Sequence, residues 1–132
     1  MRSNLKFSTV LATLAFSSAT LAWEITFYSD TPCNKATGSN YEYWNYVGTG
    51  QSPCLDIGAR APSDIECYHY KDRGASPPVR CAFDTSVRAA SFQIRSGDCE
   101  ISSDATGCYA GFGSHQLGCQ TIAAESFSCI DR

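Results

Sequence analysis

Apolar and polar residues alternate along two separate stretches of the chain, residues 23–29 (WEITFYS) and 90–95 (ASFQIR). An alternation of period two is typical of a β-strand that has one buried face. Both stretches are therefore predicted to be strands with one face turned to the core. The residues predicted to point inward are Trp23, Ile25, Phe27, Phe92 and Ile94.

Three further stretches are rich in aromatic and β-branched residues and are also predicted strands: 41–47 (YEYWNYV), 65–70 (IECYHY) and 79–83 (VRCAF). Clusters of Gly, Pro, Ser and Asp separate them and indicate turns. Residues 120–127 (QTIAAESF) could form two helical turns or a strand and a turn. The fold class predicted is all-β or nearly so, a small antiparallel β sandwich.

The first residues have the order of a secretory signal peptide. Arg2 and Lys6 precede an apolar run, and small residues lead up to Ala22. The run is short and contains Ser and Thr, so it is a poor membrane span. We expect residues 1–22 to be a leader and residues 23–132 to form one domain of a secreted, extracellular protein that does not span a membrane.

Removal of the leader makes the remaining domain more acidic. The whole chain has ten basic and 13 acidic residues. Loss of Arg2 and Lys6 leaves eight basic residues against 13 acidic ones, a net charge of −5. An acidic domain without a basic stripe offers little to nucleic acid or to an anionic membrane surface, so neither partner is expected.

Eight cysteines lie after the leader, and an even number in a short secreted chain indicates four disulfides. No Cys-x-x-Cys pair is present, and His69 and His115 lack the spacing of a zinc finger, so no metal and no cofactor is expected. The cysteines are Cys33, Cys54, Cys67, Cys81, Cys99, Cys108, Cys119 and Cys129.

The spacing of the cysteines suggests an internal repeat but leaves the pairing open. Cys54 follows Cys33 by 21 positions, and Cys129 follows Cys108 by 21 positions. Around them, Gly-Ser pairs and the triplets CLD (54–56) and CID (129–131) match at an offset of 75. A duplication would pair Cys33 with Cys54 and Cys108 with Cys129. The alternative is a short hairpin clamped between Cys99 and Cys108.

The ITFYSD segment, a glycine-containing turn and a second aromatic strand together resemble a Greek-key motif of the βγ-crystallin type, as found in some secreted killer toxins. The resemblance covers residues 23–47 and 99–114 and implies two duplicated Greek-key motifs. It also implies a calcium site at DCEISS (98–103), with Asp98, Ser102 and Ser103 as ligands. Cys99 stands where a further oxygen ligand belongs, and a turn-shaping role for Asp98 is the favoured interpretation.

The chain as a whole is similar to fungal small secreted cysteine-rich proteins, many of which are effectors. The similarity lies in the leader, about a hundred mature residues, eight cysteines and the lack of an Asn-x-Ser/Thr sequon. It implies a non-enzymatic virulence effector that acts on a host extracellular target. The alternative is a killer-toxin-like or antimicrobial protein, although membrane-active proteins usually need a cationic face. A small secreted ribonuclease is a third interpretation.

The candidate catalytic residues form no recognisable constellation. His69 lies three residues from both Glu66 and Asp72, and a His beside carboxylates could act as a general base in a ribonuclease. No local motif brings two such groups onto one phosphate. His115 lies in a glycine-rich loop, and no serine has a nucleophile elbow. We therefore expect no enzyme and no catalytic residue.

The aromatic stretch 41–47 is the best candidate for a binding surface. On a strand, Tyr41 and Tyr43 point to one side while Trp44 and Tyr46 point to the other. Glu42 points to the same side as Trp44 and Tyr46, and a charged residue there suits the rim of a binding surface better than a core. We therefore predict that Trp44 and Tyr46 are exposed and bind a host protein or a cell-wall glycan, and that the protein is a monomer.

Overall fold

The computed structural model describes residues 22–30, 33, 41–81, 87–103, 108, 112–114 and 118–131. The predicted leader, apart from Ala22, and His115 lie outside the described residues. Within these ranges the only helical segment is the 3-10 turn η2 (Asp72–Gly74), and no helix is long and apolar enough to span a membrane. The strands are β1 (Trp23–Tyr28), β2 (Tyr43–Gly48), β3 (Leu55–Asp56), β4 (Glu66–Tyr70), β5 (Val79–Arg80), β6 (Ser91–Ser96), β7 (Asp98–Ser102), β8 (Phe112–Ser114), β9 (Gly118–Gln120) and β10 (Ser126–Ile130).

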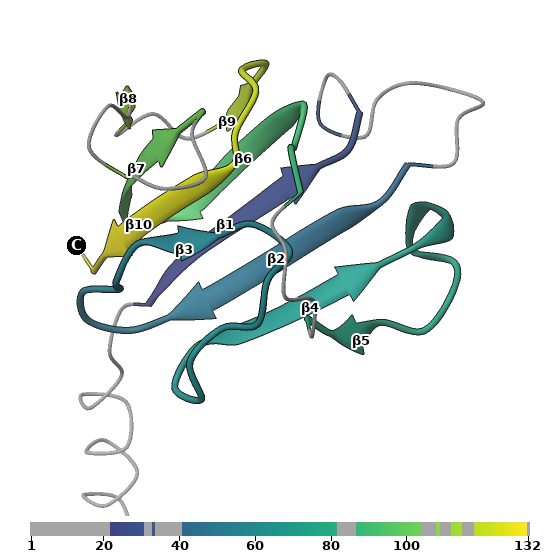
Figure 1. Ribbon diagram of the computed structural model, residues 1–132, viewed down its shortest axis with the longest axis horizontal. Helices are drawn as coiled ribbons and strands as arrows, with labels where there is room; N and C mark the ends of the chain where they lie inside the picture. The colour runs from purple at the N-terminus through teal and green to yellow at the C-terminus, as the bar shows by residue number, and fades with distance from the viewer. Residues whose placement is uncertain are drawn as a thin grey trace, which may run out of the picture.

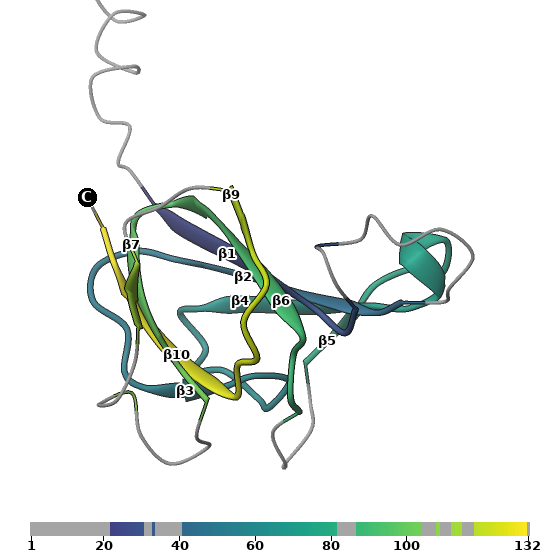
Figure 2. The ribbon, with the colours of Figure 1, turned by 90° about the horizontal axis from the view of Figure 1, so that it is seen from above.

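The strands form two antiparallel sheets (Figure 1). The first sheet has six strands in the order β5-β4-β2-β1-β6-β9, and the second has four in the order β3-β10-β7-β8. The second sheet lies against one face of the first, which makes a sandwich (Figure 2). The predicted class of a small antiparallel β sandwich is confirmed. The second sheet lies over β1 and β6, and it leaves β4 and β5 at the uncovered end of the first sheet (Figure 1).

The core lies between the two sheets. Alternate side chains of each long strand point into this space. All five residues that the alternation turned inward are fully buried: Trp23, Ile25, Phe27, Phe92 and Ile94. The second sheet contributes Ile101 and Phe127, and the Phe127 ring lies 4.8 Å from that of Phe27. Fully burying a side chain of this size stabilises the fold by about 1.5–3 kcal/mol.

Gly48 ends β2 where a larger residue would not fit. A Cβ atom at this position would lie 2.4 Å from Cζ2 of Trp23 and 2.8 Å from Cε2 of the same ring. The glycine therefore lets the indole of Trp23 lie flat against the neighbouring strand, inside the core.

The prediction of four disulfides is confirmed, and no described cysteine is free. Both pairings suggested by the sequence are wrong. Cys99 and Cys129 are cross-strand partners in β7 and β10, and their Cα atoms lie 4.1 Å apart. The complete set of bonds is Cys33–Cys119, Cys54–Cys108, Cys67–Cys81 and Cys99–Cys129.

The strand pairing agrees with the predicted pair of equivalent Greek-key motifs. The first sheet contains the order β2-β1-β6-β9, and the second repeats it as β8-β7-β10-β3. β1 pairs with β2 and β6 just as β7 pairs with β8 and β10, and each half places one strand in the other sheet, β3 beside β10 and β9 beside β6. The offset of 75 holds for β1 and β7, and the β4–β5 hairpin is an addition to the first half only.

Candidate binding face

The structure contradicts the exposure of Trp44 and Tyr46 on which their predicted binding role depended. Trp44 is 4% exposed and Tyr46 is fully buried. The Tyr46 hydroxyl accepts a hydrogen bond of 2.8 Å from the backbone N–H of Gly58. Both side chains belong to the inner face of the first sheet, next to Ile25 and Phe27 of β1. They are core residues, and the sheet presents its other face to the outside.

His69 is also a core residue. It is 3% exposed, its ring is stacked on Trp44 at 4.9 Å, and its Nε2 lies 2.7 Å from Oε1 of Glu42. The carboxylate that contacts His69 is therefore Glu42 and not Glu66, which lies on the opposite face of β4. The carboxylate neighbours considered for His69 in the ribonuclease interpretation, Glu66 and Asp72, are thus replaced in the fold by Glu42. Glu42, expected to form the rim of a binding surface, instead caps a buried histidine.

Two residues of the DCEISS segment bear on the calcium site that the resemblance implied. Cys99 is bonded to Cys129, so this position supplies no oxygen ligand. Ser102 is fully buried at the end of β7. Across the described ranges, no group of three or more His, Cys, Asp and Glu side chains could hold a metal ion.

A row of tyrosines crosses the outer face of the first sheet. Tyr28 of β1 is opposite Tyr43 of β2, which is in turn opposite Tyr70 of β4. The rings of Tyr43 and Tyr70 are stacked, with centroids 4.5 Å apart and planes at 10°. Tyr41 lies 6.1 Å from Tyr43 and 6.5 Å from Tyr28, also ring to ring. We call Tyr28, Tyr41, Tyr43 and Tyr70 the tyrosine row.

Polar side chains surround the row on the same face. Arg95 donates to the Tyr28 hydroxyl at 3.3 Å and to Oγ1 of Thr26 at 3.2 Å. The amide of Asn45 donates to Thr26 at 2.9 Å and to the carboxylate of Glu24 at 3.0 Å. Tyr28 is 2% exposed beneath these groups, while Tyr41, Tyr43 and Tyr70 are half-buried. The face therefore combines partly exposed rings with fixed hydrogen-bonding groups.

The turn after β4 packs against one end of the row. Asp72, Arg73 and Gly74 all have positive φ angles, of 52°, 57° and 84°. The N–H of Arg73 donates to the carbonyl of Tyr41 at 3.0 Å, and a Cβ on Gly74 would lie 2.7 Å from the Tyr43 hydroxyl. Non-glycine residues seldom adopt such angles, and consecutive ones store strain that often accompanies a functional site.

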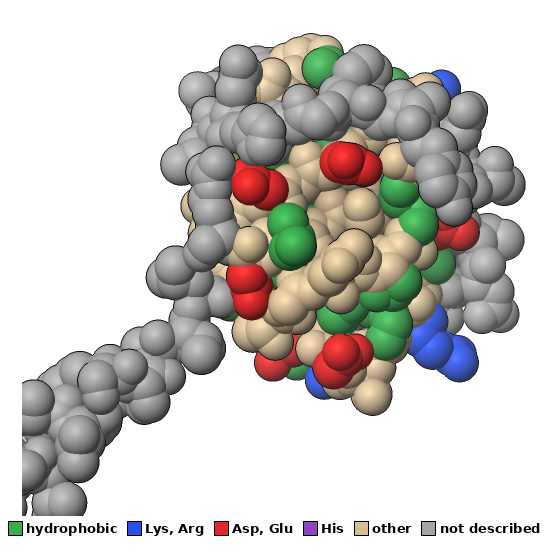
Figure 3. All heavy atoms as spheres, turned by 90° about the vertical axis from the view of Figure 1, so that its left-hand side faces the viewer, with side chains coloured by type: hydrophobic (Ala, Val, Ile, Leu, Met, Phe, Trp, Pro, Cys, Tyr) green, Lys and Arg blue, Asp and Glu red, His purple; other side chains and the backbone are tan. Residues whose placement is uncertain are grey.

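Burial is the main cause of a raised pKa at Tyr43, and the nearby Tyr70 hydroxyl raises the pKa further. The phenol of Tyr43 is consequently neutral throughout the physiological range and can both donate and accept hydrogen bonds. Tyr43 therefore contributes a neutral ring and a neutral hydroxyl group to the row. At the end of the molecule drawn in Figure 3, by contrast, acidic side chains are scattered over the surface.

Residues 23–130 match a protein family described as the C-terminal domain of the secreted LysM effector LysM14. No curated protein and no solved structure matches the chain. The match covers every strand that the structure describes, from the first residue of β1 to the last residue of β10. The secreted, extracellular location predicted from the sequence is thereby confirmed.

Proposed function

Since the chain belongs to the family described as the C-terminal domain of the secreted LysM effector LysM14, we propose that it is a non-enzymatic effector domain that binds a cell-wall glycan on the tyrosine row. Host or microbial polysaccharide would lie across the outer face of the first sheet. Its sugar rings would stack on Tyr43 and Tyr70, and its hydroxyl groups would bond to the polar side chains around them.

The observation that carries this proposal is the parallel stacking of Tyr43 on Tyr70. Two parallel rings with centroids 4.5 Å apart cover the faces that they turn toward each other, and the C–H groups of a sugar can pack against the remaining aromatic surface of the pair. The rings are already in contact before any ligand binds. Little side-chain entropy is therefore lost on binding, a term that otherwise costs about 0.5–1.5 kcal/mol per immobilised side chain.

The polar groups around the row fit a hydroxyl-rich ligand better than a protein partner. Asn45, Arg95 and Glu24 offer donors and acceptors at fixed positions on the same face. A protein hot spot usually needs an apolar anchor as well. Among the described residues the large exposed hydrophobic side chains are Val79 and Ile130, and neither belongs to the tyrosine row.

The proposal is tested by isothermal titration of the purified domain with oligosaccharides of N-acetylglucosamine, of β-glucose and of galacturonic acid. Substitution of either Tyr43 or Tyr70 by Ala should weaken binding about tenfold, because each ring provides a stacking surface. Tyr43→Phe retains the ring and should bind within about threefold of the wild type. Ile130→Ala, on the second sheet, serves as a surface control and should bind normally.

Two outcomes would overturn the proposal. One is that none of the three classes of oligosaccharide binds to the folded domain. The other is that a bound oligosaccharide is unaffected by both alanine substitutions at Tyr43 and Tyr70. The non-enzymatic part is checked separately, by measuring new reducing ends after long incubation. Their release by the wild type would show that the domain is a hydrolase.

A further inference from the structure

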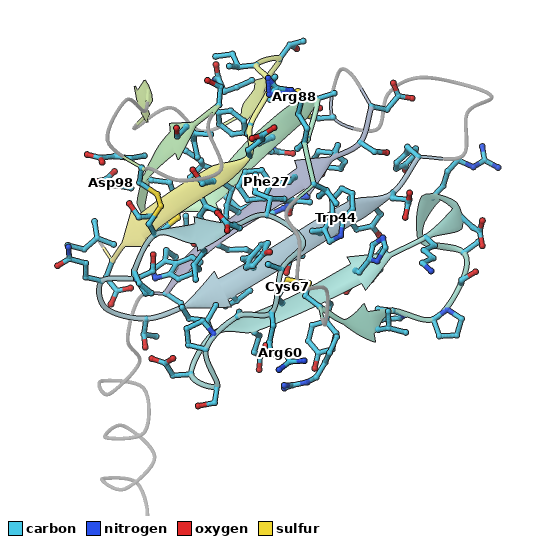
Figure 4. All side chains as sticks on the ribbon, viewed as in Figure 1. Phe27, Trp44, Arg60, Cys67, Arg88 and Asp98 are labelled. Carbon is cyan, nitrogen blue, oxygen red and sulfur yellow. A yellow bond between two sulfur atoms is a disulfide. The ribbon has the colours of Figure 1, made fainter. Side chains whose placement is uncertain are left out.

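A pocket of about 430 Å³ lies at the uncovered end of the first sheet, away from the second sheet. The β4–β5 hairpin forms one wall, and the loop before β4 forms the other. Figure 4 shows Arg60 and Cys67 at this edge of the sheet, and Arg88 at the opposite side of the molecule. The lining residues are Arg60, Ala61, Ser63, Ile65, Cys67, Arg80 and Cys81.

Two arginines line the pocket in an acidic protein. Arg60 and Arg80 both line it and both are exposed, and no acidic residue belongs to the lining. Within the described part of the chain neither arginine forms an ion pair. Arg88, by comparison, is paired with Glu125 at 3.3 Å. Two arginines that share one pocket without a carboxylate are arranged to receive an anion from outside.

The floor of the pocket is rigid and apolar. Cys67 and Cys81 are bonded to each other and are each 6% exposed, and Ile65 beside them is also 6% exposed. The disulfide fixes the two strands that carry the pocket, and Ser63 adds one hydroxyl group. The volume falls within the range of small-ligand sites, which is about 300–1,000 Å³. A ligand with a ring and one anionic group fits this combination.

Arg80 connects the pocket to the tyrosine row. Its guanidinium lies 5.7 Å from the centre of the Tyr68 ring, and Tyr68 is on the outer face of β4, two residues before Tyr70. Tyr68 and Arg80 are direct partners in the β4–β5 pairing. An extended ligand can therefore pass from the stacked pair Tyr43–Tyr70 over Tyr68 to Arg80 at the edge of the sheet. It would turn around this edge to enter the pocket, because Cys67 in the floor belongs to the inner face.

We propose that Arg60 and Arg80 bind the carboxylate of a uronic acid residue, so that the ligand is an acidic polysaccharide whose neighbouring sugars lie on the tyrosine row. This inference rests on the glycan-binding function proposed above and names the class of glycan. Guanidinium groups bind carboxylates through two parallel hydrogen bonds, and a sugar ring attached to the carboxylate can rest on the apolar floor.

The experiment compares an oligogalacturonate with the same oligomer after methyl esterification, which removes the negative charges and leaves the sugar rings unchanged. Wild-type protein should bind the charged oligomer at least about tenfold more tightly, as expected for two charge-assisted contacts. This comparison needs no variant, so its result does not depend on the folding of a mutant. Equal affinity for the two oligomers would overturn the inference.

Variants then locate the effect. Arg60→Gln, Arg80→Gln and the double variant should reduce the affinity for oligogalacturonate toward that for the esterified oligomer, and the double variant should lose about tenfold or more. The matched control is Arg88→Gln, an exposed arginine on the far side, which should bind as the wild type does. A loss of the same size in Arg88→Gln would show a general charge effect and overturn the inference.

The outcomes separate this inference from the proposed function. If the tyrosine variants lose oligosaccharide binding while the arginine variants do not, the pocket is not the anion site and the proposed function stands. If no oligosaccharide binds at all, the proposed function itself fails, and the inference with it. A short poly-glutamate peptide is the remaining arm, and binding as tight as that of oligogalacturonate would show that the pocket selects carboxylates without regard to sugar.

Discussion

Replacement of Trp44 by Ala should strongly destabilise the fold, because the indole is 4% exposed and stacks on the buried ring of His69 at 4.9 Å. Truncation of a core Trp costs about 3–5 kcal/mol. A domain of this size has a free energy of unfolding of only about 5–15 kcal/mol, so the variant would lose a large share of it. Trp44→Phe should lose much less, about 1–2 kcal/mol, since the indole Nε1 makes no hydrogen bond with any described residue.

The assay is equilibrium unfolding in urea without reductant, followed by the fluorescence of the remaining Trp23. The slope with urea should stay constant across the variants, so that the shift in midpoint reports stability alone. A double-mutant cycle with His69→Ala should give a coupling of about 0.5–1.5 kcal/mol for the stacked pair. A loss below about 1 kcal/mol for Trp44→Ala would contradict the core assignment and restore Trp44 as a candidate for binding.

Two further predictions concern the hydroxyl of Tyr46 and the disulfide at the sheet edge. Burial raises the pKa of Tyr46, so the folded protein keeps this phenol neutral where the unfolded chain ionises it. The stabilisation from this group is complete below about pH 10 and is lost as the pH rises above that value. Urea unfolding measured at several pH values should therefore show that the free energy advantage of the wild type over Tyr46→Phe shrinks above about pH 10. Joint replacement of Cys67 and Cys81 by Ala opens a loop of 14 residues and should lower the free energy of unfolding by about 3 kcal/mol, whereas an unchanged urea midpoint would exclude a stabilising role.

Five of the six strands of the first sheet could be predicted from the sequence. Aromatic and β-branched content indicated residues 41–47, 65–70 and 79–83, which contain β2, β4 and β5, and alternation indicated the other two. Residues 23–29 and 90–95 alternate cleanly, and they form β1 and β6 at the centre of the first sheet. Most of the second sheet was not predicted, because β3 and β8 are only two and three residues long. Segments this short carry too few alternations to reveal a period, and their pairing with β10 and β7 depends on the tertiary fold.

The binding face was misassigned for a specific physical reason. Both faces of β2 carry large aromatic side chains, so the alternation separates Trp44 and Tyr46 from Tyr43 without showing which set is inside. The neighbouring strand β4 decides which set of β2 side chains faces the core. Its inner face carries Cys67, which must reach Cys81, and it is this face that pairs with Trp44 and Tyr46. Because cysteine pairing cannot be deduced from spacing, that information was not accessible from the sequence.

The position of the tyrosine row follows from the same division of the first sheet. Once Trp44 and Tyr46 are needed to fill the core under the second sheet, the alternation of β2 places Tyr43 on the outside, next to Tyr28 and Tyr70 of the adjacent strands. The core holds the backbone of these strands rigid, and a rigid backbone keeps the outer rings stacked without a ligand. A shallow face can bind under these conditions, because the ordering that a flexible surface would undergo on binding is already complete.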